Sequence, residues 1–209
     1  LHSPSIQDDD LFRILYCAIE PEGAICESAS GLRPLPKKLN NISLAQRSSQ
    51  AEKGVLDEDW CSTRKASYTQ LNSELVLVNL ASHQTANALS EDALISHWIA
   101  ESGYTDLDPL IFRGPNRRLT QEVARHIWEQ TEPNAPGLPG QPIGKTVGGI
   151  YYSSRHGDGT YDYPCLALFD KRVEKLHTPD HDIDLSLDGS CPLAPAIRSA
   201  GEYLGLEIG

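Results

Sequence analysis

The chain has 209 residues, of which 39% are hydrophobic and 22% charged, so it can bury a substantial core as one domain, with or without insertions. Its 18 basic and 29 acidic residues give a formal net charge of −11, which repels phosphate backbones and anionic lipid surfaces, so we expect no direct binding to nucleic acid. No run approaches the roughly 18 consecutive apolar residues of a membrane helix, and the first residues lack the apolar core of a secretory signal, so we expect a cytoplasmic protein.

The first predicted elements are a strand and a short helix. Residues 14–19 are apolar, aromatic and β-branched, which predicts a buried strand, and Pro21 with acidic neighbours predicts a helix that begins there. Tyr16 lies in the strand. Glu27 lies in the helix between apolar and small neighbours, where a carboxylate is either turned to solvent or held for a purpose. We therefore predict that Tyr16 and Glu27 belong to an active site.

The middle of the chain alternates polar and periodic segments. Residues 31–70 are polar with little periodicity, which predicts loop with short helical pieces, whereas residues 73–80 predict a buried strand. Apolar residues at helical spacing predict a helix with Ser90 as its N-cap, and a second apolar stripe predicts a helix that begins near Thr120.

The last third returns to strands. Residues 131–148 are rich in proline and glycine and predict an exposed loop, after which residues 149–154 and 165–169 predict a β-hairpin. Residues 171–209 predict a C-terminal extension with a closing helix. We therefore expect an α/β (α+β) fold, a single domain over residues 1–209 with a mixed, partly antiparallel sheet flanked by helices.

We predict neither a thiol nucleophile from the cysteines nor a metal site from the histidine and aspartate tract. The five cysteines are odd in number and widely spaced, which is typical of reduced thiols, and the neighbours Glu22 and Glu27 would raise the pKa of Cys26. The histidine and aspartate tract at residues 177–184 could bind a divalent cation, but it lacks the glycine of a calcium loop and the spacing of a zinc helix. We predict a solvated loop and no metal.

Several short motifs follow one another in a fixed order within residues 1–170. They are Leu15-Tyr16-x-Ala18, Ala24-x-x-Glu27, Leu119-Thr120-Gln121-x-Val123-Ala124, Gly149-Ile150-x-Tyr152-x-Ser154-Arg155 and Leu168-Phe169-Asp170. Together they resemble the RES domain family, which is named for an arginine, a glutamate and a serine. Each motif is short, so the specificity lies in their conjunction.

The resemblance implies a fold, an activity and a partner. RES domains are similar in fold to ADP-ribosyltransferases, and many are toxins of bacterial toxin–antitoxin pairs that consume NAD by hydrolysis, phosphorolysis or ADP-ribosyl transfer. By motif, Glu27 matches the family glutamate, Tyr16 the strand tyrosine and Ser154 the serine. The resemblance implies NAD as substrate with no further cofactor, and a small helix-turn-helix antitoxin as partner. The acceptor, whether water, phosphate or a protein, stays open.

The family arginine stands just upstream of the first strand. Residues 1–4 resemble the segment that follows it in the family, so we expect this arginine before residue 1. Arg13 is a substitute candidate, although it lies only three residues before Tyr16.

The chemistry of NAD cleavage suits these residues. Breaking the nicotinamide–ribose bond builds positive charge on the anomeric carbon, which the Glu27 carboxylate would stabilise, and Tyr16 would offer the nicotinamide ring an aromatic face. Ser154 and Arg155 would donate hydrogen bonds to the pyrophosphate. Each residue also has an ordinary alternative: a solvated glutamate, a core tyrosine, a turn-forming serine and a surface arginine. The rival functions are a non-catalytic RES-like protein-interaction module and a thiol or metal hydrolase.

Overall fold

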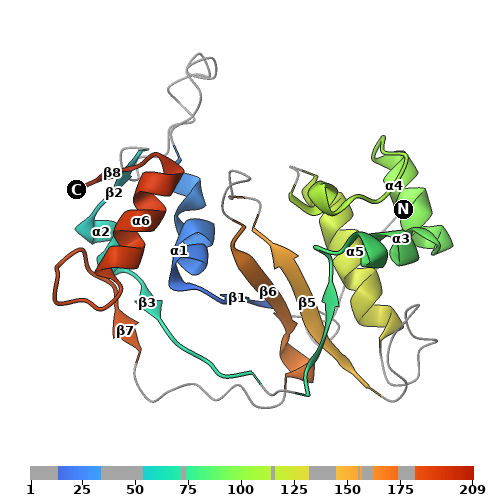
Figure 1. Cartoon of the computed structure of the whole chain (residues 1–209), viewed down its shortest axis with the longest axis horizontal. Helices are drawn as coiled ribbons and strands as arrows, with labels where there is room; N and C mark the ends of the chain where they lie inside the picture. The colour runs from blue at the N-terminus through green and yellow to red at the C-terminus, as the bar shows by residue number, and fades with distance from the viewer. Residues whose placement is uncertain are drawn as a thin grey trace, which may run out of the picture. The chain divides into compact units, whose positions relative to one another are not determined.

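The computed structural model describes residues 14–33, 54–71, 74–113, 116–131, 145–154, 156, 162–173 and 182–209 (Figure 1). The chain divides into two compact units. The first unit comprises Leu1–Ala18 and Leu71–Leu176, and the second comprises Ile19–Gln70 and His177–Gly209. Helices and strands are interspersed in both, which confirms the predicted mixed α/β class. No helix in the described segments is long and apolar enough to cross a membrane.

A four-stranded sheet forms the centre of the first unit, in the order β1-β6-β5-β4. The strands are β1 (Ile14–Ala18), β4 (Val76–Asn79), β5 (Val147–Ser153) and β6 (Pro164–Phe169). Strand β6 runs antiparallel to both β1 and β5, whereas β4 and β5 are parallel. This topology confirms the predicted mixed, partly antiparallel sheet, and the β5–β6 pairing confirms the predicted hairpin.

Strand β5 begins at Val147, within the segment predicted as loop. Its glycines explain why the chain can lie so close to its neighbours. A Cβ atom on Gly149 would lie 2.5 Å from the carbonyl oxygen of Ala167, and one on Gly148 would collide with the side chain of Leu75. Glycine here permits close packing instead of marking a turn. The rest of the predicted loop, residues 132–144, lies outside the described residues.

Helices α3 (His83–Ser90) and α4 (Ala93–Glu101) meet at a tight junction. The N-cap of α4 is Asp92, whose Oδ1 accepts hydrogen bonds from the N–H groups of Leu94 (2.9 Å) and Ile95 (3.2 Å). The prediction of Ser90 as this N-cap is wrong, because Ser90 ends α3 and its hydroxyl donates to the carbonyl of Ala86. Serine and aspartate are both good N-caps, so N-cap propensity alone does not distinguish Ser90 from Asp92.

The next elements are a short 3₁₀ helix, η5 (Pro109–Arg113), and the long helix α5 (Arg117–Gln130). Helix α5 starts before the predicted Thr120, because Asn116 accepts a hydrogen bond from the N–H of Leu119 (3.1 Å) and thereby caps it. The predicted apolar stripe of α5 is confirmed by its buried residues, which pack with those of α4 and the sheet. These core residues include Ile95, Ile99, Leu119, Val123, Ile127, Val147, Ile150 and Phe169.

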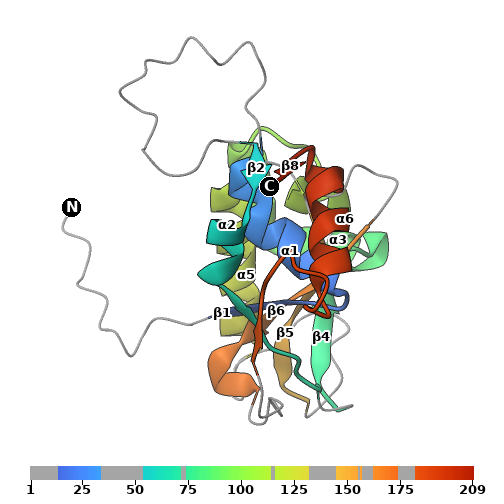
Figure 2. The same cartoon turned by 90° about the vertical axis from the view of Figure 1, so that its left-hand side faces the viewer.

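The second unit is built around two helices, α1 (Pro21–Ala29) and α6 (Ala194–Leu204), which lie side by side (Figures 1 and 2). Its remaining elements are η2 (Ser30–Leu32), β2 (Val55–Leu56), α2 (Glu58–Ser62), β3 (Lys65–Ala66), β7 (Ile183–Asp184) and β8 (Glu207–Ile208). Strand β2 pairs with β8 in parallel, and β3 with β7 antiparallel. The predicted C-terminal extension therefore contributes β7, β8 and the predicted closing helix, α6, to the second unit.

Candidate functional site

Tyr16 lies at the middle of β1, one of the two edge strands of the four-stranded sheet, where its backbone pairs with Ala167 of β6. Its side chain is 66% exposed, and the nearby Leu15 and Ile19 are also exposed. The prediction of a buried strand is therefore wrong for β1, and so is the alternative of a core tyrosine. The apolar composition of a strand does not reveal whether the strand lies at the edge or the centre of a sheet. The aromatic ring is accessible to a ligand.

Glu27 lies on α1 and is partly buried, whereas its neighbours Cys26 and Ala29 are fully buried. Burial raises the pKa of the Cys26 thiol to about 11, with further increases from the charges of Glu27 and Glu22 and an opposing decrease from Arg33. Cys26 is therefore protonated near neutral pH and is a poor nucleophile. Glu27 is only partly buried and is the stronger candidate for chemistry on α1.

The two principal candidates belong to different units. Tyr16 is part of the first unit and Glu27 of the second. In sequence, only Ile19 and Glu20 separate the end of β1 from the start of α1.

Ser154 follows the last residue of β5 and is completely buried. Its N–H donates to the carbonyl of Tyr163 (2.9 Å), and its hydroxyl oxygen accepts a hydrogen bond from the N–H of His156 (3.1 Å). These bonds are those of the turn-forming serine considered as the alternative. The other candidates, Arg155 and Arg13, lie outside the described residues.

The acidic tract considered for metal binding is described only at its end. Asp184 pairs with Lys65 (3.3 Å) and Asp182 accepts a hydrogen bond from the Ser67 hydroxyl, whereas residues 177–181 lie outside the described residues. Across the described segments, no three histidine, cysteine or acidic side chains are grouped as metal ligands.

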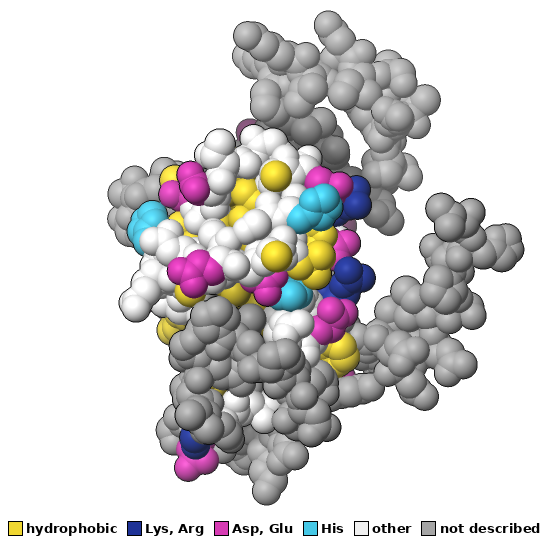
Figure 3. All heavy atoms as spheres, turned by 90° about the vertical axis from the view of Figure 1, so that its right-hand side faces the viewer, with side chains coloured by type: hydrophobic (Ala, Val, Ile, Leu, Met, Phe, Trp, Pro, Cys, Tyr) yellow, Lys and Arg dark blue, Asp and Glu magenta, His cyan; other side chains and the backbone are white. Residues whose placement is uncertain are grey.

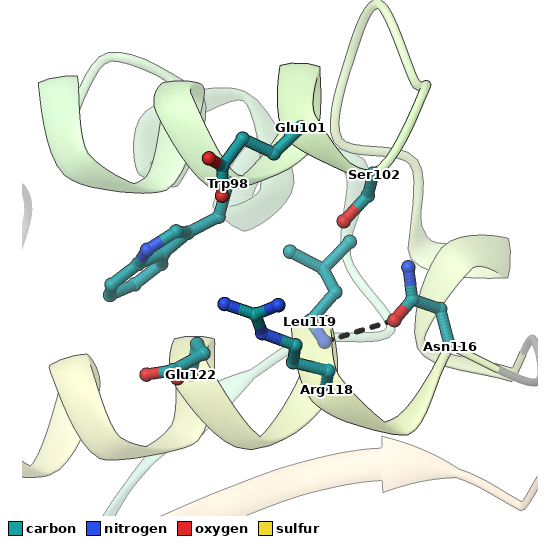
Figure 4. A pocket seen from close by; sticks show the side chains of 7 residues that line it. All are labelled: Trp98, Glu101, Ser102, Asn116, Arg118, Leu119 and Glu122. Carbon is teal, nitrogen blue, oxygen red and sulfur yellow. Dashed lines mark hydrogen bonds between the residues drawn. The ribbon is translucent and has the colours of Figure 1, made fainter. Parts of the chain in front are cut away.

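A cavity of about 320 Å³ lies between α4 and α5 in the first unit (Figure 4). Trp98, Glu101 and Ser102 line it from the end of α4. The other wall comes from the start of α5, where the lining residues are Asn116, Arg118, Leu119 and Glu122. Sequence reasoning missed this cavity. The sequence feature that could have revealed it is Arg117-Arg118 in the first turn of a helix, because positive charge is unfavourable at the positive end of the helix dipole.

Next to this cavity, a buried histidine joins the two helices. His126 of α5 is only 3% exposed, and its Nε2 lies 3.0 Å from Oδ2 of Asp92, the N-cap of α4. The edge of its ring meets Trp98, with ring centroids 5.8 Å apart. Among the described residues, the buried Nδ1 of His126 has no hydrogen-bond partner. The pair joins α4 to α5. The His126 ring is buried, whereas the Asp92 side chain is 29% exposed, and the burial of the ring favours a structural over a catalytic role.

The chain matches no protein-family model, and no curated protein and no solved structure is significantly similar to it. Its function is therefore inferred from its own residues.

Proposed function

We propose that this chain is a cytoplasmic, toxin-like enzyme with an ADP-ribosyltransferase-like fold that consumes NAD by cleaving its nicotinamide–ribose bond. The observation that carries the proposal is the exposure of Tyr16 on an edge strand that leads, after two residues, into the helix bearing Glu27. The exposed ring lies beside the exposed Leu15 and Ile19, and such an apolar surface is one on which a planar ring can stack. The choice of NAD as the substrate rests on the order of the motifs, which resembles that of RES domains.

In this proposal Glu27 supports the chemical step. Its carboxylate stabilises the positive charge that develops on the anomeric carbon as nicotinamide leaves, and Tyr16 stacks on the nicotinamide ring. Ser154 acts as a positioning residue, because its hydroxyl accepts the His156 N–H and so shapes the turn after β5. Arg155, or Arg13, donates to the pyrophosphate through a planar guanidinium. Water, phosphate or a protein side chain then accepts the ADP-ribosyl group.

The decisive experiment measures nicotinamide release from NAD by the full chain, with and without inorganic phosphate. Glu27→Gln is expected to lower the turnover rate by roughly a hundredfold or more. Glu22→Gln is the matched control, since Glu22 is a partly buried glutamate on the same helix. Unchanged turnover in Glu27→Gln, with native circular dichroism, would remove Glu27 from the mechanism.

A second pair of variants tests the aromatic contact. Tyr16→Ala is expected to raise KM for NAD about tenfold or more, because a stacking contact contributes to binding. Tyr68→Ala is the control, as Tyr68 is another tyrosine that is 50% exposed. An equal effect of both substitutions would argue against a specific role for Tyr16.

The proposed partner is a small helix-turn-helix antitoxin. Expression of this chain alone should arrest growth, and Glu27→Gln should relieve the arrest. Co-expression with a small helix-turn-helix protein encoded by a neighbouring gene should restore growth and yield a complex that copurifies.

One observation favours a second candidate, a non-catalytic RES-like interaction module. Ser154 is fully buried and its hydroxyl accepts a hydrogen bond within a turn, so the motif serine is not exposed to a ligand. Absence of NAD turnover, absence of NAD binding in calorimetry and harmless expression would together support this module over the enzyme.

A further inference from the structure

We propose that the cavity between α4 and α5 binds a small zwitterion, a free α-amino acid with an apolar side chain. The site lies wholly within the first unit and is independent of the proposed NAD chemistry. Its volume of about 320 Å³ is at the lower end of the range for small-molecule pockets and suits a ligand of this size.

The wall formed by α5 supplies a positive charge and hydrogen-bond donors. Arg118 is exposed, and within the described part of the chain its guanidinium forms no ion pair and donates no hydrogen bond. In Figure 4 this group points into the space between the two helices. The Asn116 carbonyl oxygen is occupied by the N–H of Leu119 (3.1 Å), which leaves its amide N–H₂ to donate. A carboxylate fits these donors, and a guanidinium binds it in a planar fork.

The wall formed by α4 supplies the opposite charge. Glu101 is exposed, and its described partner is His97, at 3.5 Å, a histidine that neutralises it only when protonated. The second carboxylate of the lining, Glu122, already pairs with Arg125, at 2.5 Å. Glu101 is therefore the carboxylate that is available to a ligand ammonium group.

The two helices reinforce this separation of charge. Helix α4 ends at the cavity and α5 begins there, so the negative end of one dipole and the positive end of the other both lie at the site. The partly exposed indole of Trp98 also lines the cavity (Figure 4) and offers an apolar surface for a side chain, whereas Leu119 is only 1% exposed. A ligand with an ammonium, a carboxylate and an apolar group matches all three features.

The surrounding surface disfavours a polyanion. Figure 3 shows the face on the right of Figure 1, where acidic and basic side chains lie next to each other without a broad patch of one sign. Glu101 and Glu122 line the cavity and would repel a nucleotide or a phosphorylated ligand, although Arg118 would attract it. A ligand whose single carboxylate is balanced by an ammonium group has no net charge and avoids this repulsion.

Isothermal titration calorimetry with the full chain tests the proposal. L-leucine, L-phenylalanine and L-tryptophan are the probes, and at least one should saturate at millimolar concentration. Two analogues of leucine serve as controls: 4-methylpentanoate lacks the ammonium and 3-methylbutylamine lacks the carboxylate. Each is expected to bind at least tenfold more weakly than L-leucine. Equal binding of either analogue, or no binding of any amino acid, would overturn the proposal.

Matched variants then locate the site. Arg118→Gln and Glu101→Gln should each weaken amino-acid binding at least tenfold. Their controls are Arg117→Gln, an exposed neighbour outside the lining, and Glu129→Gln, an exposed glutamate that pairs with Arg125 (3.7 Å). Binding that is lost equally in the variants and their controls would place the ligand elsewhere. All four positions are exposed, and thermal unfolding verifies that the variants fold.

Discussion

The imidazole of His126 and the carboxylate of Asp92 form a hydrogen-bonded pair, 3.0 Å apart, that links the middle of α5 to the first turn of α4. One carboxylate oxygen caps α4 and the other meets the histidine, so a single side chain stabilises a helix end and a helix–helix contact. Burial raises the pKa of Asp92, but hydrogen bonds from the Ile95 N–H, His126 and the Leu94 N–H outweigh it and lower the pKa below its ordinary value of 3.8.

Substitutions of Asp92 should separate these two functions. Asp92→Ala is expected to lower the free energy of unfolding by about 1–2 kcal/mol, because the cap and the histidine contact are both lost. Asp92→Asn should cost less, since asparagine is an equally good N-cap. Urea denaturation followed by circular dichroism measures both. An Asn variant as unstable as the Ala variant would show that the charge, rather than the cap, is what matters.

The pH dependence of the same variants follows from the direction of the pKa shift. A carboxyl whose pKa is lowered in the folded state contributes stability above its ordinary pKa of 3.8 and loses it as the pH falls through the folded value. The difference in unfolding free energy between wild type and Asp92→Asn should therefore be constant near neutral pH and shrink below about pH 4. A difference that grows on acidification would contradict the assigned shift.

Gly149 should be intolerant of any side chain. A Cβ atom there would lie 2.5 Å from the Ala167 carbonyl oxygen and 3.0 Å from the Leu168 Cα, and backbone atoms of a central sheet cannot move aside cheaply. Gly149→Ala is expected to destabilise the chain by about 1–3 kcal/mol. Gly31→Ala is the control, because nothing lies within 4 Å of its Cβ position. Equal midpoints for both variants in thermal unfolding would show that β5 can shift.

Much of the secondary structure could be predicted because it is encoded locally. Pro21 begins α1, and the apolar stripe of α5 identifies its buried face. The N-cap was misplaced because Ser90 and Asp92 are both good cap residues and lie two positions apart; Ser90 instead ends α3, where its hydroxyl donates to the Ala86 carbonyl. The exposure of Tyr16 depends on the strand order of the sheet, which the sequence of a single strand does not specify.

The candidate site was predictable only in part for the same reason. The strand and helix that carry Tyr16 and Glu27 were predicted in the right places, since both follow from local patterns. The cavity beside Trp98 and Arg118 depends on where one helix ends and another begins, a junction that arises from tertiary packing. Ser154 was assigned from a motif, whereas its hydrogen bonds depend on the turn that follows it.

Arg172 should contribute strongly to stability. Its guanidinium donates to the Trp128 carbonyl near the C-terminus of α5, to the Thr131 hydroxyl and to the Val147 carbonyl (3.3 Å). It also lies over the ring of Trp128, 5.3 Å from its centroid. Arg172→Ala is expected to cost about 2–3 kcal/mol in chemical denaturation, because hydrogen bonds to a charged group and a cation–π contact are lost together.

Two variants control for charge and exposure in the Arg172 measurement. Arg172→Lys keeps the charge but not the planar fork, so it should recover less than half of the lost stability. Arg125→Ala removes an exposed arginine whose partners are Glu122 and Glu129, and should cost no more than about 1 kcal/mol. Full recovery by lysine would show that charge alone accounts for the effect.

The thiols should differ in reactivity according to their burial. Burial raises the pKa of Cys26 and of Cys61 to about 11, so both are protonated and inaccessible near neutral pH. Burial also raises the pKa of Cys17, but this thiol is only partly buried and should react first with a thiol reagent such as dithionitrobenzoate. Native protein at pH 7.5 should show one fast thiol, which Cys17→Ser removes, whereas protein in guanidinium chloride should show all five. Fast modification of Cys26 or Cys61 in the native state would contradict their assigned pKa values and revive a thiol mechanism.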